Sequence, residues 1–347
     1  MKKVGIVTLY GEYNFGNRVQ NYAVQEILKK YKLDVETIKY LGENDDVARS
    51  ETKKDQIRLN HFREFNKKIK FGDEILYKEK EVSDTLKNRY EYIVMGSDQI
   101  WNYTFDTIFS DKALGSFMPK NKKISLSASI GVNQPPEKNT EMYDMFKTCI
   151  EDIKSISVRE DAGKKIIEEM TGRKDVEVLL DPTMIIETEK WEEVMKKPVN
   201  LSNKKFILKS FLGNDNNGIL KEIEEYAEKN DYEIIDISNS DSEFFDIGPS
   251  EFLYLEKNAE LVITDSFHAC VFAILFNTQF GVIKRNDSKL KDMYSRIETL
   301  LNTFDIPKRV LIDRLTDDIL KGEFDKVEKI LEKERKRADD FLKATLI

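Results

Sequence analysis

Short apolar runs alternate with helical patterns along most of this chain, and this rhythm restricts the fold more than any other feature of the sequence. Residues 4–10 and 35–40 predict buried strands, and residues 18–31 between them predict a helix with one apolar face. A repeated strand–helix–strand order is typical of parallel sheets with helices on both faces. We therefore expect an α/β fold.

The rhythm continues on both sides of a turn signal at Asp181 and Pro182. Before the turn we expect a charged helical excursion over residues 50–88, strands at 92–95, 123–129, 155–158 and 176–180, and a helix at 160–170. After the turn we expect strands at 205–211, 233–237, 261–264 and 280–283, with helices at 189–196, 214–229, 251–258 and 266–277. The pattern predicts two Rossmann-like domains, at residues 1–182 and 183–325, followed by a C-terminal helix at 326–347.

Composition excludes several classes of protein. A chain of 347 residues can bury a core without disulfide or metal staples, and its net charge of -8 argues against a nucleic-acid or membrane-surface protein. Cys149 and Cys270 lie far apart, with no CxxC or Cys/His cluster, so we expect no zinc site. The N-terminal apolar run is too short for a signal peptide, and no run reaches the ~20 residues of a membrane span. We expect a cytoplasmic protein.

The loop at residues 10–18 leaves the first predicted strand and begins the first predicted helix. Ligands of parallel sheets bind beyond the carboxyl ends of the strands, so such loops are the places to search. Gly11 and Gly16 allow a ligand to approach the backbone closely, and a helix N-terminus favours an anion. The loop matches neither GxGxxG nor a P-loop, and a plain strand–helix turn with Asn17 as N-cap explains it equally well.

Two further strand ends in the first half carry polar side chains. Ser97, Asp98 and Gln99 follow a strand and precede Trp101, a grouping typical of a surface that binds a sugar or another small polar ligand. A structural Asx or Ser turn is the alternative. Arg159 ends another strand, where its guanidinium either holds a carboxylate or phosphate or pairs on the surface with the acids that follow it.

Only two histidines are present, which leaves few candidates for imidazole chemistry. His61 lies in a charged helical stretch and is expected to face solvent. His268 follows a strand, in the first turn of a helix that Asp265 or Ser266 can cap. The helix dipole disfavours a protonated imidazole there unless an anion offsets it. A structural histidine is the alternative for His268.

Basic side chains follow in the second half of the chain. Lys284 and Arg285 end a predicted strand, and Arg296 and Arg309 follow farther on. A solvated charged face is the alternative for each of these residues. The position of Lys284 and Arg285 at a carboxyl end of a strand favours contact with a ligand.

Six motifs that occur in one order connect these loops to a known family. They read NFGNRVQNYA at 14–23, GSDQIWN at 96–102, SVRE at 157–160, LDPT at 180–183, TDSFH at 264–268 and SRI at 295–297. Each motif is weakly specific alone, but six in order are jointly specific. Through them the chain resembles the polysaccharide pyruvyl transferase family over about residues 5–310.

The resemblance implies a fold like that of the GT-B glycosyltransferases, with two Rossmann-like domains facing a central cleft. It also implies transfer of a pyruvyl group from phosphoenolpyruvate to two hydroxyls of a sugar, in a cell-surface polysaccharide or its lipid-linked precursor. A cyclic ketal forms and phosphate is released. No metal or organic cofactor is implied, and a lipid-linked acceptor would bring the protein to the inner face of the membrane. The N-terminal domain is then the acceptor side and the C-terminal domain the donor side.

Residues that match the family's motifs take their expected roles from the resemblance. In the family, the positions of Arg159 and His268 are associated with phosphoenolpyruvate binding or catalysis. We expect His268 to protonate the enol or to neutralise the leaving phosphate, and Asp98 to take the hydroxyl proton. The expected substrate-binding residues are Gly16, Asn17, Arg18, Ser97, Gln99, Trp101, Arg159, Ser266, Lys284, Arg285 and Arg296.

One departure from the family concerns the donor site. Well-studied members carry an arginine two residues before the histidine, where this chain has Ser266. We hypothesise that Lys284, Arg285 or Arg296 supplies the missing charge. These three cations are expected to converge with Arg159 on one cleft, as a positive island in an acidic protein. The alternatives are a nucleotide-sugar glycosyltransferase on the same fold and a non-catalytic sugar- or anion-binding relative.

Overall fold

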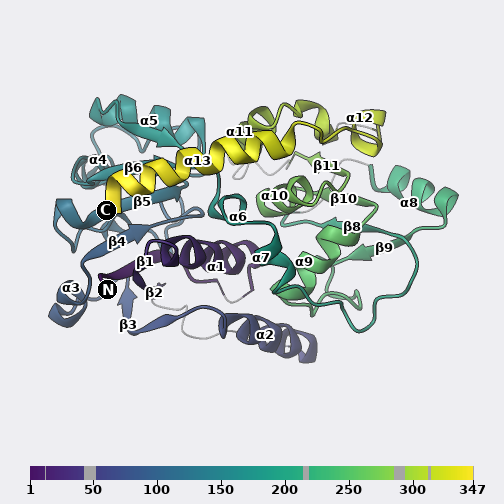
Figure 1. Cartoon of the computed structure of the whole chain (residues 1–347), viewed down its shortest axis with the longest axis horizontal. Coiled ribbons are helices and arrows are strands. Elements are labelled where there is room, and N and C mark those ends of the chain that lie inside the picture. Colours follow the sequence, from purple (N-terminus) through teal and green to yellow (C-terminus); the bar gives the residue numbers. More distant parts are fainter. Residues whose placement is uncertain (12, 43–51, 214–218, 285–293, 312–313, 347) are drawn as a thin grey trace. The chain divides into compact units, whose positions relative to one another are not determined.

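The computed structural model describes residues 1–11, 13–42, 52–213, 219–284, 294–311 and 314–346. The chain forms two compact units, and Figure 1 labels most of their helices and strands. Unit 1 contains Met1–Arg49, Asn66–Ile186 and Lys333–Ile347, and unit 2 contains Ser50–Phe65 and Glu187–Glu332. The expected boundary lay at residue 182. The chain instead passes from unit 1 to unit 2 after Ile186. In addition, Ser50–Phe65 belongs to unit 2 although residues of unit 1 precede and follow it, and Lys333–Ile347 belongs to unit 1 although it follows unit 2 in the sequence.

Unit 1 is built on a sheet of seven parallel strands in the order β3-β2-β1-β4-β5-β6-β7. The strands are β1 (Lys3–Leu9), β2 (Asp34–Leu41), β3 (Phe71–Tyr77), β4 (Tyr92–Met95), β5 (Lys123–Ala128), β6 (Ser155–Val158) and β7 (Val176–Val178). Val4, Ile6 and Val7 of the central strand β1 are fully buried. A continuous apolar strand of this kind is typical of a parallel sheet covered on both faces.

Unit 2 is built on a sheet of five parallel strands in the order β12-β11-β10-β8-β9. The strands are β8 (Phe206–Ser210), β9 (Glu233–Asp236), β10 (Leu261–Thr264), β11 (Phe280–Ile283) and β12 (Val310–Leu311). Ile263 of the central strand β10 lies opposite Lys209 of β8 and Gly281 of β11. The helix that follows β10 is apolar and buried along its whole length, which fixes its first turn against the sheet.

Helices connect the strands in both units. Those in unit 1 are α1 (Phe15–Lys29), α3 (Asp84–Arg89), α4 (Glu141–Glu151), α5 (Asp161–Thr171) and α6 (Pro182–Ile185), with short 3₁₀ turns η1 (Asp111–Leu114) and η2 (Lys120–Lys122). Those in unit 2 are α7 (Glu189–Glu192), α8 (Ile219–Asn230), α9 (Pro249–Asn258), α10 (Phe267–Leu275), α11 (Ser295–Thr303), α12 (Asp317–Leu320) and the turn η4 (Pro307–Arg309). None of the helices in the described ranges is long and apolar enough to cross a membrane.

The charged excursion over residues 50–88, predicted to be helical, contains a strand. Residues 71–77 form β3 at the edge of the first sheet, and only α2 (Lys53–Asn66) and α3 within the excursion are helical. Leu76 of β3 is buried and Asp73 is exposed, because one side of an edge strand faces solvent. Its exposed charges made the segment resemble the charged helices on either side. Helices α4 and α11 and strand β12 were also not predicted.

Helix α2 belongs to unit 2 although it lies between two strands of unit 1 in the sequence. The ammonium of Lys54 donates to the backbone carbonyls of residues 240–242 at 2.9–3.0 Å. His61, expected to face solvent, is half-buried where α2 meets Gly248. A Cβ on Gly248 would lie 2.6 Å from the Cβ of His61, so this close helix contact requires glycine.

Helix α13 (Val327–Leu346) begins in unit 2 and ends in unit 1. Arg335 donates through Nε to the carbonyl of Met184 at 2.9 Å and through Nη2 to the carbonyl of Ile186 at 2.8 Å. The hydroxyl of Tyr31 donates to Asp339 over 2.6 Å. The end of the chain therefore satisfies the last carbonyls of α6 and packs on unit 1.

Glu36 is a charged residue inside the first sheet. Its carboxylate is almost fully buried in β2 and accepts from Arg89 Nε at 2.6 Å and from the Tyr90 hydroxyl at 2.8 Å, with Lys3 Nζ at 3.0 Å. Burial by itself would raise the pKa of Glu36, but the hydrogen bonds from Arg89, Tyr90 and Lys3 lower it to about 2. The sheet is therefore stabilised by the ionised form of this side chain.

We expect Glu36→Gln to lower the free energy of unfolding at pH 7 by about 3 kcal/mol. The folded pKa lies below the unfolded one, so the contribution of Glu36 is complete above about pH 4.5 and is lost as the pH falls toward 2. Urea unfolding of the wild type and the variant at pH 7 and pH 3 measures this difference. Exposed Glu91→Gln is the control, and a deficit in Glu36→Gln that does not shrink at pH 3 would contradict the prediction.

Candidate functional site

Each sheet has one point at which the order of its strands reverses. In unit 1 the chain adds β2 and β3 on one side of β1 and then β4 on the other side. In unit 2 it adds β9 on one side of β8 and then β10 on the other side. Ligands of open parallel sheets bind outside the carboxyl ends of the strands at such switch points. The loops after β1 and β4 define one candidate site, and the loops after β8 and β10 define another.

The loop after β1 leads into helix α1. Asn14 is the N-cap, because its side-chain oxygen accepts from the N–H of Asn17 at 3.1 Å. The alternative with Asn17 as N-cap is therefore wrong. Asn17 lies in the first turn, and its Nδ2 donates to Asp98 Oδ2 in the loop after β4. Gly11 packs against this side chain so closely that a Cβ there would lie 2.3 Å from Asn17 Oδ1.

Asp98, at the switch point between β1 and β4, has a tightly held backbone and side chain. Its φ of +59° lies in the left-handed region, which a residue other than glycine adopts only where its surroundings enforce it. Oδ1 accepts from the N–H of Gln99 at 2.8 Å, and the backbone carbonyl of Asp98 accepts from the N–H of Ser129 at 2.9 Å. Together with Asn17, these contacts fix the carboxylate at the carboxyl ends of the strands.

Arg159 follows β6 and joins this site from the next loop. Its side chain is 1% exposed, and Nη1 lies 2.7 Å from Asp181 Oδ2 while Nη2 lies 3.4 Å from Asp98 Oδ1. Burial by itself would lower the pKa of Arg159, but Asp181, Asp98 and Glu160 raise it above its usual value. The alternative of a surface pair is wrong, because Arg159 is a buried cation held between carboxylates.

Three acidic side chains surround Arg159, and we call them the carboxylate cluster (Asp98, Glu160 and Asp181). Glu160 is fully buried, and its Oε1 accepts from the N–H groups of Ile130 at 2.8 Å and Gly131 at 3.1 Å. One cation among three carboxylates leaves the surroundings of Arg159 negative. Within unit 1, the charged side chains that contact Arg159 are therefore carboxylates.

Asp181 is a site residue that the sequence reasoning missed. It is buried at the end of the segment that follows β7, where it is the N-cap of α6 and accepts from the N–H of Thr183 at 3.0 Å. It also accepts from the Ser97 hydroxyl at 2.8 Å and from Arg159. The signal was present, because an aspartate before Pro182 is typical of a helix start, but the segment was interpreted as a turn and as a family motif, and Asp181 was given no role.

Of the remaining residues of unit 1 that were predicted to bind substrate, some hydrogen-bond within the loops at the switch point and one lies in the hydrophobic core. Ser97 is fully buried and bridges Asp181 and the carbonyl of Ser127, and Gln99 is half-buried and accepts from Asn102 at 2.9 Å. Trp101, expected to face a sugar, is fully buried and donates from its indole N–H to the carbonyl of Ala113 at 3.1 Å, which makes it a core residue.

Arg18 and Gly16 of α1 are also buried. The Arg18 guanidinium donates to the carbonyl of Leu9 at 3.1 Å and lies 4.7 Å from the ring centroid of Tyr10. These contacts fasten the start of α1 to the end of β1. They do not leave the guanidinium exposed to a ligand, because its side chain is fully buried.

His268 lies in the first turn of α10, at the switch point between β8 and β10. Ser266 is the N-cap and is half-buried, and its N–H donates to Thr264 Oγ1 at 2.9 Å. The His268 ring is almost fully buried and meets the ring of Phe267 edge-on at 5.4 Å between centroids. The N-terminus of α10 therefore presents its positive dipole end beside an imidazole.

Asp265 connects the two loops of this second switch point. Its carboxylate accepts from the N–H of Leu212 at 2.7 Å and from the N–H of Gly213 at 2.9 Å, both in the loop after β8. These hydrogen bonds give Asp265, in the TDSFH motif that also contains His268, a structural role. Asp265 holds the loop after β8 against the start of α10.

Two of the predicted cations belong to unit 2 and lie over aromatic rings. The Arg296 guanidinium, in the first turn of α11, lies 5.8 Å from the ring centroid of Phe267. Lys284 directly follows β11, and its ammonium lies 4.4 Å from the ring centroid of Tyr294. Arg285 lies outside the described residues. Within unit 2, Arg296 and His268 therefore flank the same phenyl ring, and Lys284 lies against the residue that precedes α11.

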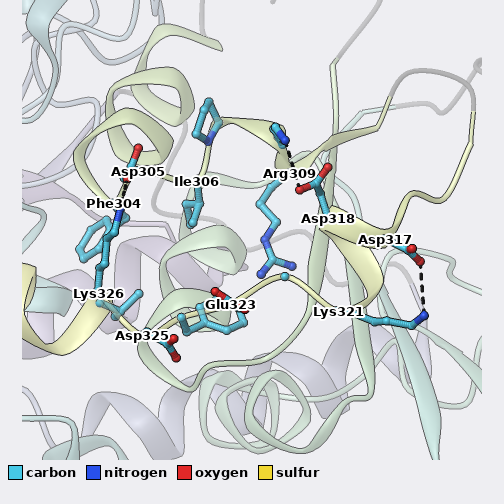
Figure 2. A pocket seen from close by; sticks show the side chains of 15 residues that line it. Phe304, Asp305, Ile306, Arg309, Asp317, Asp318, Lys321, Glu323, Asp325 and Lys326 are labelled. Carbon is cyan, nitrogen blue, oxygen red and sulfur yellow. Dashed lines mark hydrogen bonds and ion pairs between the residues drawn. The ribbon is translucent and has the colours of Figure 1, made fainter.

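Arg309 is buried next to β12, the edge strand of the second sheet. The alternative of a solvated position for Arg309 is therefore wrong. Its guanidinium lies 5.2 Å and 4.6 Å from the ring centroids of Phe280 and Phe324, and burial lowers the pKa of Arg309 to about 10. It reaches into a pocket of about 630 Å³ between η4, α12 and the segment at residues 321–327 (Figure 2). This pocket lies at the amino ends of the strands, away from the switch point, so we assign it no role in the site.

The described ranges hold no group of three or more histidine, cysteine, aspartate or glutamate side chains arranged for a metal ion. Each unit instead has a cluster of its own, and the two clusters differ in the charged side chains that they contain. In unit 1 the carboxylate cluster surrounds one arginine, and in unit 2 a helix N-terminus lies beside His268 and Arg296. The first suits proton removal from a hydroxyl, and the second suits an anion.

A family model described as polysaccharide pyruvyl transferase matches residues 14–287. No curated protein matches the chain significantly.

Solved structures show the fold. A Listeria monocytogenes protein described as a UDP-N-acetylglucosamine 2-epimerase is 12% identical with a TM-score of 0.53, covering 97% of this chain and 90% of that one. Staphylococcus aureus MnaA in a co-structure with UDP is 13% identical with a TM-score of 0.50, covering 96% and 91%. The likeness confirms the predicted α/β fold of GT-B type.

Proposed function

Because the chain belongs to the polysaccharide pyruvyl transferase family, we propose that it transfers a pyruvyl group from phosphoenolpyruvate to two hydroxyls of a sugar. The acceptor is a cell-surface polysaccharide or its lipid-linked precursor. The observation that carries the proposal is the family match over residues 14–287, which includes the start of α1 and the loops after β4, β8 and β10. A lipid-linked acceptor would bring the enzyme to the inner face of the membrane.

The donor is proposed to bind at unit 2. Phosphoenolpyruvate carries a carboxylate and a phosphate, and such groups are held by cations and helix N-termini. Unit 2 offers the start of α10, His268 and Arg296, and the last two both lie against the ring of Phe267. Arg296 and Lys284 are proposed to supply the charge that the family's arginine would supply at the position of Ser266.

The acceptor is proposed to bind at unit 1. A sugar hydroxyl becomes a nucleophile when a base takes its proton, and carboxylates held in fixed geometry serve as such bases. Asp98 is the proposed base, because it lies at the switch point and Asn17, Gln99 and Arg159 orient its two oxygens. The negative surroundings of Arg159 suit a neutral sugar better than a second anion.

The proposed reaction begins with protonation of C3 of the enol, for which His268 is the proposed acid. C2 then becomes electrophilic, and the first sugar hydroxyl adds to it while Asp98 takes the hydroxyl proton. The C2–O bond to phosphate breaks with its electron pair, and inorganic phosphate leaves. The second hydroxyl adds to C2, its proton is released, and the cyclic ketal closes.

Incubation with phosphoenolpyruvate and a set of lipid-linked oligosaccharides, read by mass spectrometry, tests the function. We expect the mass of one ketal-linked pyruvyl group on an acceptor and release of one phosphate. In parallel, phosphoenolpyruvate at 100 times its Kd should stabilise the protein by about 2.7 kcal/mol in a melting experiment. Stabilisation by a UDP-sugar in its place would favour a glycosyltransferase, and phosphate binding without turnover would favour a non-catalytic relative.

The same melting experiment tests the donor residues. Arg296→Ala and Lys284→Ala should each reduce the stabilisation by phosphoenolpyruvate. Lys308→Ala, an exposed lysine of unit 2 at the pocket near Arg309, is the matched control and should leave it unchanged. If phosphoenolpyruvate stabilised both Arg296→Ala and Lys284→Ala as much as the wild type, neither residue would supply the positive charge that Ser266 lacks.

A further inference from the structure

The two oxygens of the Asp181 carboxylate have different partners. Oδ1 accepts from the N–H of Thr183 at 3.0 Å and from its hydroxyl at 2.8 Å, which caps α6. Oδ2 accepts from Arg159 Nη1 at 2.7 Å and from the Ser97 hydroxyl at 2.8 Å. One oxygen therefore serves the helix, and the other serves the switch point between β1 and β4.

Arg159 is held more tightly at Asp181 than at Asp98. Its Nη1 lies 2.7 Å from Asp181, whereas its Nη2 lies 3.4 Å from Asp98 Oδ1. The Asp181 side chain is fully buried, while the Asp98 side chain keeps 8% of its surface exposed. Asp98 is thus the member of this chain of contacts that lies nearer to solvent, and Asp181 anchors the other end.

We infer that Asp181 is a positioning residue: it holds the Arg159 guanidinium so that Arg159 orients and balances the charge of Asp98. The inference rests on the proposed role of Asp98 as the base. It gives Arg159 a different role from the expected one, because its guanidinium contacts carboxylates of the protein rather than presenting itself to the donor. A phosphate or carboxylate at Arg159 would meet the whole carboxylate cluster.

The contacts favour this role over a purely structural one. A capping aspartate needs one oxygen for the N–H of the first turn, and Oδ1 satisfies that need at Thr183. Oδ2 makes its two bonds to residues of the loops after β4 and β6, both of which end at the site. The second oxygen therefore acts on the side chains that orient Asp98.

Asp181→Asn separates the two roles, because the amide oxygen can remain on Thr183 while the amide nitrogen replaces Oδ2. We expect kcat for ketal formation to fall by about 10–100-fold with little change in KM for phosphoenolpyruvate. Asp98 then has one negative charge fewer in its surroundings, with Arg159 and Glu160 still present, so the acid limb of the pH–kcat profile should move to lower pH. An unchanged kcat and acid limb would overturn the inference.

Thr183→Val is the matched control, because it removes the hydroxyl bond to Oδ1 and leaves Oδ2 untouched. It should melt at a lower temperature and keep the wild-type acid limb. A shift of the acid limb in Thr183→Val equal to that in Asp181→Asn would overturn the inference, since the cap would then be the cause.

A second measurement does not require Asp181→Asn to fold and does not depend on turnover. In Asp98→Asn, Asp181 should still hold Arg159, so nitrogen NMR should show separate, slowly exchanging Nη signals for Arg159 as in the wild type. Averaged Nη signals in Asp98→Asn would overturn the inference. Absence of ketal formation by the wild type would contradict the proposed function alone, because the NMR result stands apart from it.

Discussion

The His268→Gln variant should form ketal with a kcat about 10²–10⁴-fold lower than the wild type while still binding phosphoenolpyruvate. Glutamine keeps a hydrogen-bonding side chain in the first turn of α10 but cannot deliver a proton to C3 of the enol. Because the imidazole is almost fully buried at the helix N-terminus, no neighbouring water is expected to replace it efficiently. Single-turnover kinetics together with melting in the presence of phosphoenolpyruvate separate the chemical step from binding.

The other histidine of the chain is a natural control for this variant. His61 lies in α2, half-buried against Gly248, and is not part of either switch point. His61→Gln should keep the wild-type kcat. Loss of phosphoenolpyruvate binding in His268→Gln would make His268 an anion ligand rather than the acid, and full activity would exclude both roles.

Arg159→Met should lower the free energy of unfolding at pH 7 by about 3–5 kcal/mol. Methionine fits the buried space but leaves the carboxylate cluster without its cation. An ionised carboxylate that is buried without a cation is costly, and protonation removes this cost, so the penalty is expected at neutral pH and decreases as the pH falls toward 4. The variant should therefore be closest to the wild type in stability under mildly acidic conditions.

Urea unfolding at pH 7 and pH 4.5 measures the effect of Arg159→Met. Lys165→Met in α5 removes a cation from an exposed pair, with 3.8 Å between Lys165 Nζ and Glu169, and should cost no more than about 1 kcal/mol. A similarly small loss for Arg159→Met would mean that the carboxylate cluster is not held by Arg159. A loss that is equally large at both pH values would contradict the electrostatic cause.

The buried strands were predictable from sequence because they are apolar on both faces. β1, β4, β8, β10 and β11 read as short continuous apolar runs, and their order gave two parallel sheets. β3 was not predictable in the same way, since its exposed side carries the charges that the periodicity of a helix can also accommodate. The sequence could not predict that α2 belongs to unit 2, because this depends on tertiary contacts such as the hydrogen bonds of Lys54.

The location of the candidate site was also predictable, but the role of each side chain was not. Polar residues after strands, such as Asp98 and His268, were found by the rule that ligands bind at carboxyl ends. Trp101 shows where that rule fails, because the next residues of the loop turn back into the core. Arg159 shows a second limit: an isolated cation in the sequence gained its partner Asp181 from a loop 22 residues away.

Helix α13 has a consequence for the order in which the protein is made. Residues 333–347 belong to unit 1, and Arg335 bonds the carbonyls at the end of α6, yet the whole of the second sheet is synthesised between those two partners. Domains generally fold as they leave the ribosome, N-terminal first. Here the first unit to emerge is the last to be completed, so unit 1 of a nascent chain lacks part of its packing until residues 333–347 have been synthesised.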